Sequence, residues 1–144
     1  MALAFYDSSQ TLIDASNPIR TSHNGFVGES DEVLFHIRND STDRYYEEIS
    51  VEIEDLEGYG TTPEYEHKGW SFKLLYGSRR PTEKEWDMAT SMAPLLVPDL
   101  GDDTGGDDTT YLPIWLRIYV PGGTRAQYRP NYSLKITAIE KVVP

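Results

Sequence analysis

Five aspartates crowd the short segment DLGDDTGGDDTT, residues 99–110, and are the side chains best suited to bind a metal ion. The segment carries no basic residue, and its glycines leave the backbone adaptable. Ca²⁺ prefers several hard oxygen ligands, but the spacing departs from the EF-hand loop, where acids alternate before a glycine. Two interpretations stay open: a calcium site, or an exposed acidic loop outside the core. The candidate ligands are Asp99, Asp102, Asp103, Asp107 and Asp108.

A second group of residues has the chemistry of a protein contact. Arg125, Tyr128 and Arg129 lie between Pro121 and Pro130, a stretch without any acidic residue. Aromatic and arginine side chains are enriched in protein interfaces and dominate their binding energy. We therefore predict that these three residues contact another chain, with Tyr128 as the anchor. The alternative is that they are ordinary solubilising residues of a turn.

Trp115 and Tyr119 form a third candidate. They lie four residues apart in an alternating segment, so a strand would place them on one face about 13 Å apart. Exposed aromatic platforms of this kind bind sugars. Two other interpretations compete: the face is covered by other segments of the chain, or the aromatics contact another protein.

Catalytic patterns are missing from the sequence. There is no cysteine and no Gly-x-Ser-x-Gly motif, so no nucleophile is placed beside a base. His23, His36 and His67 are dispersed, and none has a second histidine at metal-ligand spacing. His36 falls on the polar face of its segment, where we expect an ordinary surface histidine. We predict that the protein is not an enzyme and needs no cofactor other than the calcium ion considered above.

The elements that must position these residues show the two-residue alternation of half-buried β-strands. In EVLFHIRND, Val33, Phe35 and Ile37 share one face, and Leu34, His36 and Arg38 share the other. Weaker alternation occurs at residues 3–6 and 11–13. Four further stripes are predicted to face a core: Ile49, Val51 and Ile53; Trp70, Phe72, Leu74 and Tyr76; Leu112, Ile114, Leu116, Ile118 and Val120; and Tyr132, Leu134, Ile136 and Ala138.

Turn residues separate the stripes, and short strands with one polar face predict an all-β antiparallel sandwich. One short helix is expected near residues 83–92, because Thr82 and Glu85 fit a capping box and the pattern ends before Pro94. No repeat or linker divides the chain, so residues 1–144 are predicted to form one domain. Four residues test the assignment of faces, since all are expected to be buried: Val51, Phe72, Leu116 and Ile136.

The chain is strongly acidic, with 24 aspartates and glutamates against 13 lysines and arginines and a net charge of −11. Such a body is repelled by phosphate backbones, which argues against general nucleic-acid binding. No stretch is long and apolar enough to span a bilayer, and the apolar start is too short for a signal peptide. We expect neither a membrane nor a nucleic acid among its partners.

Two stretches resemble known families. VLFHIRNDSTDRYYEEISVEIED (33–55) resembles the early strands of immunoglobulin-like domains. LPIWLRIYVPGGTRAQYRPNYSLKITAIE (112–140) resembles the closing strands of β-sandwich proteins in tailed-phage virions, such as head-decoration and tail or baseplate accessory proteins. The resemblance implies an immunoglobulin-like sandwich and a viral structural subunit present in many symmetric copies.

The sequence therefore favours a non-catalytic structural protein of a tailed-bacteriophage virion, made in the host cytoplasm. Its expected partners are other capsid or tail proteins and copies of itself, and its basic loop at 121–130 could meet an acidic loop of a neighbour. Two alternatives remain: a carbohydrate-binding module and a calcium-dependent adhesion module.

Overall fold

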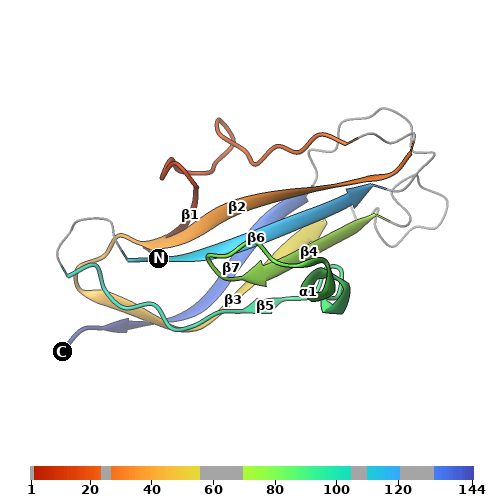
Figure 1. Ribbon diagram of the computed structural model, residues 1–144. Coiled ribbons are helices and arrows are strands. Elements are labelled where there is room, and N and C mark those ends of the chain that lie inside the picture. Colours follow the sequence, from red (N-terminus) through yellow and green to blue (C-terminus); the bar gives the residue numbers. More distant parts are fainter. Residues whose placement is uncertain (1, 24–26, 56–69, 105–109, 121–131) are drawn as a thin grey trace.

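The alternating segments fold into β-strands that a computed structural model arranges in two layers (Figure 1). The structure describes residues 2–23, 27–55, 70–104, 110–120 and 132–144. Within these ranges the elements are β1 (Leu3–Asp7), β2 (Glu29–Asn39), β3 (Arg44–Asp55), β4 (Ser71–Tyr76), α1 (Glu83–Met88), β5 (Leu95–Leu96), β6 (Tyr111–Val120) and β7 (Tyr132–Val142).

The strands form a four-stranded sheet, β1-β2-β6-β4, and a three-stranded sheet, β5-β3-β7. Every pairing between these strands is antiparallel. The prediction of an all-β fold with two antiparallel sheets and one short helix is thus confirmed. The strand order does not establish the immunoglobulin-like topology, which stays a prediction.

One cluster of apolar side chains fills the space between the sheets. The four-stranded sheet contributes cross-strand pairs such as Phe35 with Ile114, and β3 contributes a stripe that includes Val51. Three of the four predicted test residues, Val51, Phe72 and Leu116, are buried. Ile136 is only partly buried, because it lies on β7, the last strand of its sheet. The predicted strand faces are therefore right, although burial decreases at this edge.

A bulge in β3 changes which residues face the core. Glu47 pairs with Ile139 and Ser50 with Thr137, so β3 has one extra residue between the two pairs. Glu48 takes up this residue with a φ of 51°, in the left-handed region. Tyr46 therefore turns inward and is buried, although the alternation of Ile49, Val51 and Ile53 alone would turn it outward.

The helix begins where the sequence predicts and ends earlier. The Thr82 side chain accepts from the Glu85 N–H, and Glu85 accepts from the Thr82 N–H, so the capping box is present. α1 ends at Met88 instead of near residue 92. The chain leaves the helix because it bonds to the edge of β4: Met92 donates to the carbonyl of Phe72, and Phe72 donates to the Ser91 hydroxyl.

Candidate functional site

The two aromatics predicted on β6 lie on the outer face of the four-stranded sheet but differ in exposure. Tyr119 is 38% exposed. Trp115 lies between Leu34 of β2 and Leu75 of β4 and is partly buried, and its indole N–H has no acceptor among the described residues. The two rings therefore do not form one flat exposed platform. The other predicted interface residues, Arg125, Tyr128 and Arg129, lie outside the described residues.

The start of the aspartate-rich segment is built into the fold. Leu100 is buried and exchanges two backbone hydrogen bonds with Tyr46, at 2.9 and 3.0 Å. Asp103 is 1% exposed, and its N–H donates to the carbonyl of Ser41 at 2.7 Å. The expectation of an exposed loop is therefore wrong for Asp103, because the neighbouring 39–44 turn holds its backbone.

The described part of this segment does not assemble a calcium site. Within the described ranges, no three histidine, aspartate or glutamate side chains lie close enough together to hold a metal ion. The Asp102 carboxylate accepts from the hydroxyl of Thr104, and Asp103 is turned toward Thr110. Asp107 and Asp108 lie outside the described residues, so the full five-residue ligand set stays a prediction.

A polar hollow of about 270 Å³ lies on the outer face of the four-stranded sheet. The side chain of Glu32 is only 8% exposed there and pairs with Arg80. Arg117 lies across from Glu32 in the register, with its Nε 3.8 Å from the carboxylate. The hollow is lined by Ser30, Asp31, Glu32, Arg80, Glu83, Trp115 and Arg117.

The ion pairs of this hollow fasten α1 to the sheet. Both terminal nitrogens of Arg117 donate to the Glu83 carboxylate, at 2.9 and 3.0 Å. This guanidinium holds the pKa of Glu83 below its ordinary value. Arg117 also lies 5.9 Å from the ring centre of Trp86, the buried residue of α1, and Lys73 donates to the Trp86 carbonyl. The charged groups are thus engaged with one another, which gives the hollow a structural role.

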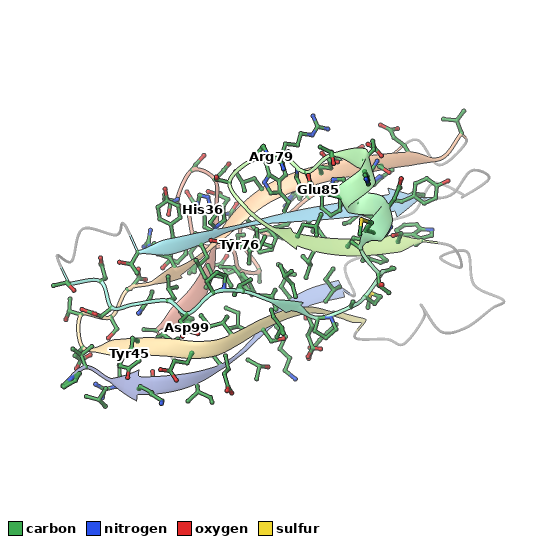
Figure 2. The ribbon with its side chains drawn as sticks, turned by 60° about the horizontal axis from the view of Figure 1, so that its bottom comes forward. His36, Tyr45, Tyr76, Arg79, Glu85 and Asp99 are labelled. Atoms are coloured by element: carbon green, nitrogen blue, oxygen red, sulfur yellow. The ribbon has the colours of Figure 1, made fainter. Side chains whose placement is uncertain are left out.

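His36 is buried, and the expectation of a surface histidine is wrong. It points to the outer face of the four-stranded sheet (Figure 2), but Gln10 and Tyr111 cover it there. The amide nitrogen of Gln10 donates to His36 Nδ1 at 2.6 Å, and the Tyr111 ring stacks on the imidazole at 4.6 Å. The same Gln10 amide accepts from Arg38 through its oxygen. This arrangement requires a neutral imidazole with an unprotonated Nδ1.

The stability of the domain is expected to fall as the pH drops from about 7.5 to about 5. Burial lowers the pKa of His36, and the nearby Asp7 carboxylate offsets this only in part. The unfolded chain therefore takes up a proton first, at about pH 6.5, which favours unfolding below that pH. Urea unfolding of the wild type and of His36→Gln at both pH values measures the effect. The variant should lose less stability over this range, whereas equal losses in the two proteins would contradict the prediction.

The outer face of the three-stranded sheet has a centre of apolar and small polar side chains between two sets of ion pairs, and the exposed Glu48 lies beside it at the bulge. Leu96 of β5 is 78% exposed and lies beside Ser50, which pairs with Thr137 of β7. Ile139 of β7 is 44% exposed on this face. Lys135 pairs with Glu52 and Glu54 on one side of the centre, and Lys141 pairs with Glu47 on the other. We call Leu96, Ser50, Thr137 and Ile139 the central patch.

β7 lies at the margin of this sheet, and its C-terminal part runs along the lower left of the view in Figure 2. It is eleven residues long, and none of the described residues pairs with the edge that faces away from β3. Such an edge presents N–H and C=O groups to any chain that approaches in an extended form. The sequence placed the interface at 121–130 and at Trp115 and Tyr119, and it missed this edge. Its signal was the polar face of the last stripe, where Lys135 and Lys141 occupy positions typical of an edge strand.

No described helix has the length and apolar character needed to cross a bilayer. No protein-family model matches the chain, and no curated protein is similar enough to be identified as its relative.

Proposed function

We propose that the chain is a non-catalytic structural subunit of a tailed-phage virion, which binds neighbouring capsid or tail proteins and further copies of itself. The observation that supports binding is the exposed three-stranded sheet. Its central patch combines apolar side chains with small polar ones, and ion pairs lie on two sides of it. An apolar centre with a polar rim is the usual anatomy of a protein interface. The virion as the place of binding follows from the resemblance of residues 112–140 to phage β-sandwich proteins.

The ion pairs on the outer face of the four-stranded sheet also support the role of a structural subunit. Arg117, Glu83 and Glu32 hold α1 and the sheet together and thereby fix the crossing from β4 to β5. This crossing delivers Leu96 to the central patch. A subunit present in many copies benefits from such a fixed surface, because less conformational freedom is lost when it binds.

The proposal is tested by the amount of the protein in assembled particles. The double variant Leu96→Asp with Ile139→Thr should keep its melting temperature, since both side chains are exposed and threonine suits a strand position opposite Glu47, but its occupancy in particles should fall at least about ten-fold. Met88→Asp is the matched control, because Met88 is equally exposed but lies on α1. Absence of the wild-type protein from particles, or full occupancy of the double variant, would refute the proposal.

A further inference from the structure

The backbone of β7 offers a regular row of hydrogen-bonding groups at its open edge. Val143, which follows β7, donates its N–H to the carbonyl of Asp43 at 2.9 Å. In an antiparallel ladder, residues that bond to the partner strand alternate with residues whose N–H and C=O groups point away. The register shift lies on the β3 side, so the alternation continues along β7. The odd-numbered residues therefore bond toward β3, and Leu134, Ile136 and Ala138 direct their backbone groups to the open edge.

The side chains of these three residues face the space between the sheets. They pack against the buried cluster but are only partly buried themselves, whereas Val51 and Ile53 of the adjacent β3 are buried. Among the residues that the structure describes, the opposite sheet has four strands and this sheet has three. One more strand beside β7 would give both sheets four strands and would cover the side chains of Leu134, Ile136 and Ala138. Its inward side chains would have to be apolar.

The outward face of β7, which points away from the core, carries positive charge. The outward row contains Lys135 and Lys141, which are about half exposed although each pairs with a glutamate of β3. Ser133, Thr137 and Ile139 complete this row, so it contains no acidic residue. In an antiparallel pair, residues directly opposite share a face. Two copies of β7 paired with each other would therefore place no carboxylate opposite either lysine. A strand from a different segment, with acids on its outward face, would be complementary.

We propose that the open edge of β7 accepts an extended segment of a neighbouring protein as an added antiparallel strand. The segment has apolar residues on the face toward the core and acidic residues on the face toward Lys135 and Lys141. Main-chain hydrogen bonds supply affinity in this mode of recognition, and the alternating side chains supply specificity. The inference rests on the proposed function and names the kind of partner that the exposed sheet takes.

A synthetic peptide of about nine residues, alternating valine with glutamate and threonine, tests the edge directly. Its control has the same composition, with the valines grouped at one end. The alternating peptide should bind the full chain at least about ten-fold more tightly in fluorescence anisotropy. Hydrogen exchange should then slow at the amides of Ile136 and Ala138 and stay unchanged at Thr137, which already bonds to β3.

Two sets of variants test separately what the backbone hydrogen bonds of β7 and what its lysine charges contribute to peptide binding. Ala138→Pro removes a donor at the open edge, which an edge strand tolerates, and should weaken peptide binding at least about ten-fold while the chain stays folded. Thr137→Pro is its counterpart and should unfold or destabilise the domain, because it removes a bond to β3. Lys135→Gln with Lys141→Gln should weaken binding several-fold at low salt, and Lys84→Gln on α1 should leave it unchanged.

Equal binding of the two peptides, or protection confined to other strands, would overturn the inference. Unchanged affinity in both Ala138→Pro and the double lysine variant would do the same. The proposed function would survive that result if the wild-type chain still entered particles and the Leu96 and Ile139 variant did not. Conversely, specific peptide binding by a chain that never enters particles would keep the edge site and reject the virion role.

Discussion

Truncation of Leu116 to alanine is expected to lower the free energy of unfolding by about 2–5 kcal/mol. Leu116 is buried in β6, between Val33 of β2 and Leu74 of β4, and it belongs to the cluster that joins the two sheets. The loss combines the transfer of the removed groups with the cavity that they leave, since β6 is paired on both sides and cannot move in to fill it. Urea unfolding, followed by circular dichroism, gives the change.

Ile136→Ala is the matched control for this prediction. Ile136 points into the same cluster but is partly exposed at the β7 edge, where neighbouring groups and water can relax around the gap. Its loss should therefore be clearly smaller than that of Leu116→Ala. A loss below about 1 kcal/mol for Leu116→Ala would mean that β6 is assigned to the wrong face.

The strands were predictable because alternation is a local signal. The stripes of β2, β3, β4, β6 and β7 could be recognised from neighbours two residues apart, and Phe35, Val51 and Leu116 are buried as that pattern requires. The start of α1 was predictable for the same reason, since the capping box joins Thr82 to Glu85 within one turn. The C-terminal end of α1 was not, because it depends on bonds between Met92 and the distant Phe72.

The burial of these polar residues could not be predicted from the sequence, because segments distant in the chain cover them. His36 lies on the outward face of β2 as alternation requires, but Gln10, twenty-six positions away, covers it. Asp103 looked exposed in an acidic run, but the turn at Ser41 takes up its backbone. Tyr46 turned inward through the bulge at Glu48, a residue whose type gives no hint of a left-handed conformation.

For the candidate site, too, the sequence predicted the local residue types but not the features that depend on the arrangement of the strands. Sequence chemistry identified aromatic and arginine residues at 121–130, which lie outside the described residues. The edge of β7 could be recognised only once the strand order was known, because an edge strand and a central strand share the same alternation. Lys135 and Lys141 were visible in the sequence, but their meaning depends on β7 being last in its sheet.

Replacement of Asn39 by alanine is the second change expected to have a large effect, with a loss of about 3 kcal/mol in the free energy of unfolding. Asn39 ends β2 and is 0% exposed. Its amide nitrogen donates to the carbonyls of Arg44 and Gly101, at 2.9 and 2.8 Å, and its amide oxygen accepts from the N–H of Ser41. Alanine would leave the carbonyls of Arg44 and Gly101 and the N–H of Ser41 without this partner, which is itself fully buried. The cost of such groups exceeds the net gain of ordinary hydrogen bonds.

Asn17→Ala provides the matched control, since its amide nitrogen also makes two hydrogen bonds, to the Leu12 carbonyl and to Asp7. Water can replace those bonds at this more open position, so its loss should be about 1 kcal/mol or less. Asn39→Asp tests the hydrogen bonds at nearly constant side-chain shape. Aspartate keeps the acceptor for the Ser41 N–H, but it cannot donate to the carbonyls of Arg44 and Gly101, and it adds a buried charge. It should therefore destabilise at least as much as Asn39→Ala. Equal and small losses for Asn39→Ala and Asn17→Ala would show that the 39–44 turn does not hold the 99–104 segment through this side chain.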